Sequence, residues 1–243
     1  MKEQPTWDIR QGDCLEMIKR MEDETVDAVV TDPPYGTASP TKVQTHGGRS
    51  VEAFEIEWDR EAPTGWLEDA ARVLKPGGAL VVFGDTKKTT DIWNDVEAAG
   101  MRPLQCFYWI KANPPPQPRQ NFQSAVEVAV FARKPGKVIH WGGGGATPNH
   151  HAAPIAAGND RTEHPTQKPL SLMRHLVRLV TPPGGLVLDP FAGSGTTICA
   201  AILENRNAIG IELSEDYCRI ARQRVEGWEA SDQARQGDLF GES

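Results

Sequence analysis

Apolar runs rich in β-branched residues alternate with helical patterns along nearly all of this 243-residue chain. Such alternation is typical of a parallel sheet covered by helices on both faces. The expected strands span residues 7–11, 27–31, 79–84, 104–110, 126–132, 185–190 and 207–212. The expected helices span residues 14–21, 65–74, 89–99, 168–180, 196–205 and 215–227. We therefore predict an α/β fold with a doubly wound, seven-stranded and mostly parallel sheet, and the chain is long enough to bury its core.

One connection departs from this alternation. The segment NPPPQPRQNF separates the strands 104–110 and 126–132 and has no helical pattern. We expect these two strands to pair antiparallel, so that one edge of the sheet is mixed. The polar segments at about 37–64 and 133–163 are long for plain connections. We interpret them as a lid loop and a target-recognition insertion of a single domain, 1–227, followed by a flexible tail, 228–243.

Cysteine and histidine spacing gives no sign of a metal site or a disulfide framework. Four widely spaced cysteines lie in apolar segments, where we expect buried free thiols: Cys14, Cys106, Cys199 and Cys218. His150 and His151 are adjacent in a glycine-rich stretch, which is not a regular ligand pattern. The chain shows neither an apolar stretch of signal-peptide type at its start nor a run of about 18 apolar residues, so we expect a cytoplasmic protein.

Charge is unevenly distributed along the chain. The formal net charge is −7, but residues 102–178 carry +7 and the remainder −14. A basic segment on an acidic body can contact phosphate groups, which favours a nucleic-acid partner. On charge alone, a solvated charged face explains the segment equally well.

A glycine-containing turn near the C-terminus indicates a nucleotide-like ligand. The segment GLVLDPFAGSGTTICAAILENRNAIGIELS reads as a strand, a turn with Gly193 and Gly195, a helix, and a strand that ends in Glu212. Glycines in such a turn allow close backbone approach, and an acid about 20 residues onward can bind ribose hydroxyls. Ile198 stands where the dinucleotide pattern has its third glycine, so NAD is disfavoured and another nucleoside cofactor is expected.

Four motifs together resemble those of the amino-group DNA methyltransferases that use S-adenosylmethionine. They are QGDCLE at 11–16, TDPPYG at 31–36, HPTQKP at 164–169 and DPFAGSGTT at 189–197. Their order, with D-P-P-Y before F-x-G-x-G, is that of the β group of this family. The resemblance covers about residues 7–227 and implies a Rossmann-like methyltransferase fold.

The resemblance also implies a set of cofactor-binding residues. Asp13 would contact the adenine amino group of S-adenosylmethionine, Glu212 its ribose, and Asp189 its methionine amino group; acids at strand ends suit such donors. The full set is Asp13, Cys14, Lys168, Asp189, Phe191, Ala192, Gly193, Ser194, Gly195, Thr196, Thr197 and Glu212.

The stretch Asp32, Pro33, Pro34 and Tyr35 is the implied catalytic segment. Methylation of an exocyclic amine requires acceptors that hold its hydrogens, and the Asp32 carboxylate and the Pro33 carbonyl would serve. The prolines lack N–H donors, so we expect no group of this segment to compete for those acceptors. Tyr35 would stack on a base flipped out of the duplex.

The expected activity is site-specific methylation of duplex DNA. No cysteine follows a proline, which disfavours ring-carbon methylation, and the Asp at the head of D-P-P-Y favours adenine N6 over cytosine N4. Three alternatives remain open: an N4-cytosine enzyme, a silent DNA-binding relative, and an amino methyltransferase for RNA or protein. The implied substrate contacts are Tyr35, Asn113, Arg119 and Phe122, although Val126 stands before Glu127 where commoner family members have a histidine.

Two further partners are expected besides double-stranded DNA. Relatives of this family often pair, which suggests a homodimer. The peptide QGDLF, from Gln236 to Phe240, resembles the short segments by which bacterial DNA enzymes bind the replication sliding clamp.

Overall fold

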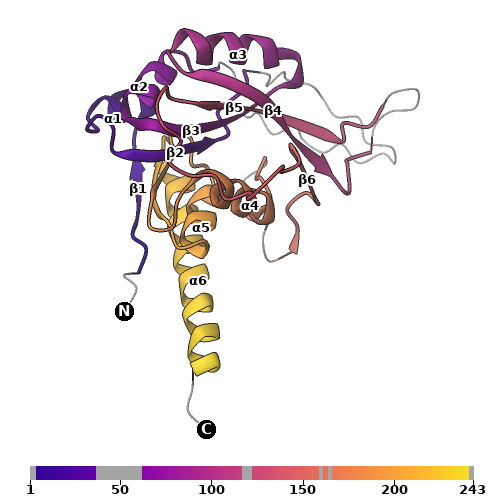
Figure 1. Ribbon diagram of the computed structural model, residues 1–243. Helices are drawn as coiled ribbons and strands as arrows, with labels where there is room; N and C mark the ends of the chain where they lie inside the picture. The colour runs from indigo at the N-terminus through magenta and orange to yellow at the C-terminus, as the bar shows by residue number, and fades with distance from the viewer. Residues whose placement is uncertain (1–3, 37–61, 117–121, 159–160, 164–165, 241–243) are drawn as a thin grey trace.

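The computed structural model describes residues 4–36, 62–116, 122–158, 161–163 and 166–240, with side chains described as far as Ala230 (Figure 1). It contains one eight-stranded sheet in the order β1-β8-β7-β2-β3-β5-β4-β6. The strands are β1 (Trp7–Gln11), β2 (Val26–Thr31), β3 (Leu74–Gly84), β4 (Arg102–Lys111), β5 (Val126–Arg133), β6 (His150–Ala153), β7 (Leu186–Asp189) and β8 (Asn207–Glu212). The α/β class and the seven expected strands are confirmed.

The eighth strand corrects the expected number of seven. Strand β6 lies within the segment that we interpreted as a recognition insertion, and it pairs parallel to β4 at the edge of the sheet. Its sequence HHAA contains no β-branched residue, so propensity alone could not identify it. Part of the insertion is therefore an extension of the sheet.

The mixed edge of the sheet is confirmed. Strands β1, β8, β7, β2 and β3 run parallel, whereas β5 pairs antiparallel with both β3 and β4. The Pro-rich connection thus joins an antiparallel pair, as expected.

A bulge in β3 contains the sequence Lys-Pro-Gly-Gly, residues 75–78. Val26 is opposite Leu74, but Ala28 is opposite Ala79, so the extra residues 75–78 loop out between these pairs. Gly77 has φ +79°, and a Cβ atom there would lie 1.8 Å from the carbonyl oxygen of Lys137. Only glycine fits this close backbone approach.

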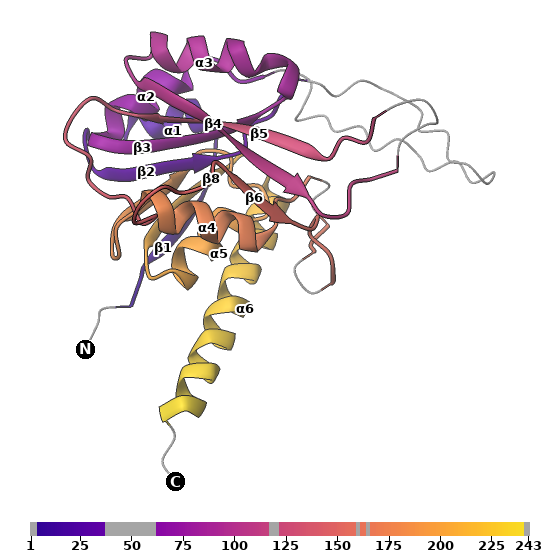
Figure 2. The same ribbon diagram turned by 45° about the vertical axis from the view of Figure 1, so that its right-hand side comes forward.

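The helices form two layers. They are α1 (Cys14–Lys19), α2 (Trp66–Val73), α3 (Thr89–Ala98), α4 (Leu170–Val180), α5 (Thr196–Leu203) and α6 (Glu215–Phe240), with a 3₁₀ turn η2 (Thr86–Lys88). Figures 1 and 2 show α1, α2 and α3 on one face of the sheet and α4, α5 and α6 on the other. Successive β2 residues alternate between the two cores, since Ala28 and Val30 pack in one and Val29 in the other. Burial on both faces explains the nearly continuous apolar strands.

The last helix is longer than the sequence predicts. Helix α6 continues to Phe240 and projects from the body of the domain (Figures 1 and 2), although we expected a helix ending at 227. The proposed mobility of residues 228–243 stays a prediction. Most of the expected lid loop, residues 37–61, lies outside the described residues.

Gly195 fixes how the glycine-containing turn packs on α6. It precedes α5 with φ +75°, and a Cβ atom at this position would lie 2.9 Å from Cβ of Ala221. Gly65 precedes α2 with a similar φ of +78°, but nothing lies within 4 Å of its Cβ position. The two glycines therefore share a backbone requirement, and only Gly195 has a packing requirement as well.

Substitution by alanine should separate these two effects. Gly65→Ala should lower the free energy of unfolding by about 1 kcal/mol, the cost of the left-handed conformation for a residue with a Cβ atom. Gly195→Ala should lower it by about 2 kcal/mol or more, because the clash with Ala221 is added. Urea unfolding of both variants checks this, and equal losses would contradict the packing role of Gly195.

Candidate active site

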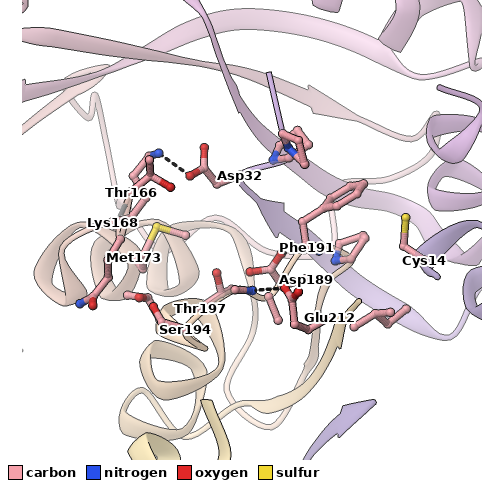
Figure 3. Close-up of a pocket in the computed structure, with 18 of the residues that line it drawn as sticks. Cys14, Asp32, Thr166, Lys168, Met173, Asp189, Phe191, Ser194, Thr197 and Glu212 are labelled. Carbon is pink, nitrogen blue, oxygen red and sulfur yellow. Dashed lines mark hydrogen bonds and ion pairs between the residues drawn. The ribbon is translucent and has the colours of Figure 1, made fainter. Parts of the chain in front are cut away.

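A cavity of about 720 Å³ opens at the carboxyl ends of the central parallel strands. Ligands of doubly wound folds bind at this edge. Acidic residues follow the ends of four adjacent strands in the spatial order of the sheet: Asp13 after β1, Glu212 on β8, Asp189 on β7 and Asp32 after β2. Figure 3 shows Cys14 toward one end of the cavity and Asp32 toward the other, with Asp189 and Glu212 between them.

Asp32 is held by two neighbours. Its Oδ1 accepts a hydrogen bond of 2.5 Å from the Tyr35 hydroxyl, and its Oδ2 accepts one of 2.5 Å from Lys168 Nζ (Figure 3). The expectation that no group competes for this carboxylate is therefore wrong, and the competitor in its own segment is a side chain rather than a backbone N–H. Burial raises the pKa of Asp32 above its ordinary value, while the ammonium group of Lys168 acts in the opposite direction.

Lys168 lies at the Asp32 end of the cavity. It lies just before α4, and its Nζ lies 3.0 Å from Glu127 Oε2 as well as next to Asp32. Burial alone would lower the pKa of Lys168, but Asp32 and the other acidic neighbours raise it well above its ordinary value. Lys168 is therefore an ammonium group at neutral pH. We expected it in the cofactor set, but its direct contacts are with Asp32, Tyr35 and Glu127.

Asp189 is buried in the middle of the cavity edge. Its Oδ1 accepts hydrogen bonds from the Thr31 hydroxyl, at 2.6 Å, and from the Phe191 backbone N–H, at 3.1 Å. Burial raises the pKa of Asp189 to about 6, even though these hydrogen bonds lower it. The carboxylate thus titrates close to neutral pH unless a cation binds beside it.

Glu212 and Asp13 are oriented by backbone amides. Glu212 accepts from Gly193 N–H and from Ser214 N–H, each at 2.8 Å. Asp13 caps α1 by accepting from Leu15 N–H at 2.8 Å, so one side chain both starts the helix and lines the cavity. Each carboxylate keeps lone pairs for a further donor, such as a hydroxyl or amino group.

The glycine-containing turn forms the floor of the cavity. Phe191, Ala192, Gly193, Ser194, Thr196 and Thr197 line it, but Gly195 does not. Arg224 Nη1 donates to Thr196 Oγ1 at 2.7 Å, and the Phe191 ring contacts Trp66 edge-on at a centroid distance of 5.2 Å. Cys14 also lines the cavity, and burial raises the pKa of its thiol to about 12, so it stays protonated.

The cavity fits the chemistry of S-adenosylmethionine. Carboxylate acceptors line it that suit ribose hydroxyls and amino groups, and apolar side chains such as Met173 and Leu213 line it too. Asp13 and Asp32, the first and last acids of the row, are three strand-to-strand spacings apart, a distance of roughly 14 Å. A nucleoside with an amino-acid arm can therefore span the row, with its far end next to Asp32.

Two expected substrate contacts do not reach this cavity. Asn113 Oδ1 accepts from Ile155 N–H at 2.7 Å and thereby positions a loop, while the Phe122 side chain is 96% exposed. Arg119 lies outside the described residues. Tyr35 lines the cavity as expected.

Several residues that line the cavity were not expected from the sequence. They are Trp109, Lys111, Glu127, Ile155, Arg161 and Met173. Trp109 donates to the Ala153 carbonyl oxygen at 2.9 Å, so β6 holds this wall in place. A charged pair on adjacent antiparallel strands, Lys111 and Glu127, was the one available signal, since their side chains face the same cavity.

Many basic residues of the segment 102–178 are engaged within the protein. Arg133 donates to the carbonyl oxygens of Gly77 and His140, Lys134 to those of Arg72 and Leu74. Lys111 and Lys168 both pair with Glu127. The charge excess of this segment therefore overstates the phosphate-binding surface.

Over the described part of the chain, no helix is long and apolar enough to cross a membrane. The same residues hold no cluster of three or more metal-binding side chains. All four cysteines are free, and Cys14, Cys199 and Cys218 are buried as expected, while Cys106 is partly exposed.

Two curated bacterial proteins are similar to this chain over most of its length. The Type II methyltransferase M2.MboI of Moraxella bovis is 27% identical over 239 residues, which cover 90% of this chain and 87% of that protein. The Type II methyltransferase M2.DpnII of Streptococcus pneumoniae is 29% identical over 236 residues, 88% of each.

A solved structure and a family model agree with these relatives. The crystal structure of the M1.HpyAVI–SAM complex is 27% identical, with a TM-score of 0.73 over 90% of this chain and 99% of that one. The model described as DNA methylase matches residues 26–157 and 148–223. Because these matches span most of the described sheet and its cavity, the chain belongs to the DNA methylase family.

Proposed function

We propose that this protein transfers a methyl group from S-adenosylmethionine to the N6 amino group of a specific adenine in double-stranded DNA. One observation carries the proposal: four acids at adjacent strand ends form a row that leads to the Asp32-Pro33-Pro34-Tyr35 segment. The row suits a nucleoside cofactor, and Asp32 suits an amine donor beside its far end. Two relatives of this chain are described as Type II methyltransferases, and we propose a sequence-specific enzyme in a restriction–modification setting here.

When bound, S-adenosylmethionine supplies a methyl group made electrophilic by its sulfonium sulfur. Asp13 would accept from its adenine amino group, Glu212 from its ribose, and Asp189 from its ammonium group. Phe191 and Met173 would shield the cavity from water. The turn residues Ala192, Gly193, Ser194, Thr196 and Thr197 would contact the methionine portion, and Gly195 would set the turn through its packing on α6.

Asp32 would hold the target amine. The nitrogen that gains a methyl group must lose a proton, and Asp32 is the carboxylate placed to accept its N–H groups. Tyr35 keeps Asp32 in place through its hydroxyl, and Lys88 Nζ fixes Tyr35 by donating to its carbonyl oxygen at 2.6 Å. Positioning and charge complementarity would therefore supply most of the rate enhancement.

The target base must leave the duplex, because an amine within a base pair cannot reach Asp32, whose side chain lines the cavity and is only 22% exposed. We propose that residues 37–64 close over the cofactor and that residues 133–163, including β6, contact the DNA grooves. Both segments belong to one catalytic domain, 1–227. Residues 228–243 would form a mobile tail of a cytoplasmic enzyme.

Cytosine N4 remains the second candidate target, since its amine presents the same geometry. Labelled S-adenosylmethionine offered with duplex DNA, RNA and protein tests the substrate class. We expect label in duplex DNA and, after hydrolysis, N6-methyladenine. N4-methylcytosine would identify the second candidate, and label in RNA or protein alone would refute the proposal.

A homodimer is supported by apolar side chains on the outer face of the β4–β5 ribbon. Tyr108 is opposite Val128 and Ile110 is opposite Val126. Tyr108, Ile110 and Val126 are all exposed, at 39%, 37% and 38%. Sedimentation of the wild type and of Ile110→Glu would show whether this face pairs two copies.

Asp32→Ala should lower the methyl-transfer rate at least about 100-fold, because the amine loses its acceptor. Its affinity for S-adenosylmethionine should change only a few fold, since the other three acids remain. Asp27→Asn is a matched control: Asp27 is a buried β2 carboxylate that pairs with Lys75 at 2.9 Å, away from the cavity. It should lose stability but keep its transfer rate, and an active Asp32→Ala variant would refute the assigned role.

Cofactor affinity should depend on pH through Asp189. Its pKa of about 6 means that it is ionised above that pH and protonated below it. An ammonium group binds the ionised form, so affinity should fall by up to about tenfold per pH unit below pH 6. Calorimetry from pH 5 to 8 should show this for the wild type, whereas Asp189→Asn should bind more weakly with a flatter profile. Equal profiles would exclude Asp189 as the titrating group.

We also propose a contact between Gln236–Phe240 and the bacterial sliding clamp. Its support is the peptide sequence at the projecting end of α6. Alanine at both Leu239 and Phe240 should abolish binding to immobilised clamp without changing methylation of free DNA. Unchanged clamp binding would exclude this contact.

A further inference from the structure

Lys168 Nζ lies between two carboxylates on different elements. It is 2.5 Å from Asp32 Oδ2 at the end of β2 and 3.0 Å from Glu127 Oε2 on β5. The Lys168 side chain is only 6% exposed. Its ammonium group also lies over the rings of Tyr35 and Phe83, with centroids 5.7 Å and 5.1 Å away. These two carboxylates, rather than water, therefore balance its charge.

The two oxygens of Glu127 contact two different lysines. Oε1 pairs with Lys111 Nζ at 2.8 Å, and Lys111 itself lies over the Trp109 ring at 5.4 Å. Oε2 is buried and receives no aligned hydrogen bond from the residues that the structure describes, although Lys168 Nζ is near it. Glu127 Oε2 thus makes an ion-pair contact with the ammonium group but has no aligned hydrogen bond from it.

Both oxygens of Asp32 already accept hydrogen bonds. Tyr35 donates to its Oδ1 and Lys168 to its Oδ2, so a target amine would share a carboxylate that already holds two donors and would weaken the bond to Lys168. Displacing Lys168 without a new partner would leave a buried charge unpaired, which is costly. A second acceptor within the same contact distance removes that cost.

We propose that Glu127 is a positioning residue, which receives the Lys168 ammonium group when the target amino group binds Asp32. This inference rests on the proposed function and adds a role for two residues outside the D-P-P-Y segment. Lys168 keeps its proton throughout, and only its main hydrogen bond changes from Asp32 Oδ2 to Glu127 Oε2. The amine then gains an acceptor while every charge stays paired.

The surrounding charges fit this exchange. Asp32, Lys168, Glu127 and Lys111 form an alternating chain with no net charge, and Asp189 is the next carboxyl group along the cavity. Burial would raise the pKa of Glu127, but Lys168 and Lys111 lower it below its ordinary value. Glu127 is therefore ionised at neutral pH and can accept from an ammonium group.

A crystal structure of Asp32→Asn tests the second acceptor without any catalysis. Asparagine keeps an oxygen at position 32 but removes its charge, as an engaged amine would partly do. We expect Lys168 Nζ to form an aligned hydrogen bond with Glu127 Oε2, shorter than its distance to the substituted side chain. Retention of Lys168 on that asparagine, with Oε2 still without an aligned bond, would overturn the proposal.

Single-turnover methylation of unmodified plasmid DNA tests the kinetic consequence. Glu127→Gln should slow transfer at least about tenfold, because Lys168 then stays on Asp32. Affinity for S-adenosylmethionine should stay within about twofold. The loss should vanish in a Lys168→Met background, where no ammonium group needs a second partner. Asp69→Asn, which removes a partly buried ion pair with Arg72 outside the cavity, should leave the rate unchanged.

In a plot of methyl-transfer rate against pH, the acid limb is the range at low pH where the rate falls. Its position distinguishes a positioning role of Glu127 from a structural defect. Transfer requires ionised Asp32, so the rate falls as pH drops through its pKa. Lys168 lowers the pKa of Asp32 and Glu127 raises it. The limb should therefore move to higher pH in Lys168→Met and to lower pH in Glu127→Gln.

The proposal would be overturned if the rate losses of Glu127→Gln and Lys168→Met were additive in the double variant. It would also be overturned if the acid limb moved in the same direction in both single variants. A wild type that binds S-adenosylmethionine but methylates no DNA would instead refute the proposed function. The Asp32→Asn structure would still decide the role of Glu127 in that case.

Discussion

The site depends on the parallel order of four strands. Because β1, β8, β7 and β2 are adjacent and point the same way, their carboxyl ends place four acids, distant in sequence, along one edge. Backbone pairing keeps that spacing, so the cavity is built by the sheet rather than by its loops. The glycine-containing turn follows the same logic, since Gly195 sets its path by packing on α6.

This arrangement buries carboxylates, which is unfavourable for their charged forms. The acids lie in a cavity that raises the pKa values of Asp32, Asp189 and Glu212, so each needs a partner to stay ionised. Backbone N–H groups partner Glu212, whereas an ammonium group partners Asp32. The difference suits their tasks, because a backbone donor is fixed and a lysine side chain can move. An acceptor that receives a substrate amine, as we propose for Asp32, needs the movable kind.

Sequence patterns predicted the fold well, but they predicted poorly the residues of β4 and β5 that line the cavity. Two-sided burial gives the central strands continuous apolar runs, which is why their positions and the cofactor turn followed from sequence. Strand β6 was missed because HHAA contains no β-branched residue and is only four residues long. Glu127 and Lys111 were missed because their role depends on the antiparallel register of β4 and β5, which spacing along the chain does not reveal. Lys168 was found through its motif, but its partner Asp32 is 136 residues away.

A crystal structure with duplex DNA and the demethylated cofactor S-adenosylhomocysteine tests the central claim most directly. We expect an extruded adenine whose N6 atom lies within about 3.2 Å of an Asp32 carboxylate oxygen and faces the cofactor sulfur. A base bound elsewhere, with Asp32 still enclosed by Tyr35 and Lys168, would contradict this role of Asp32.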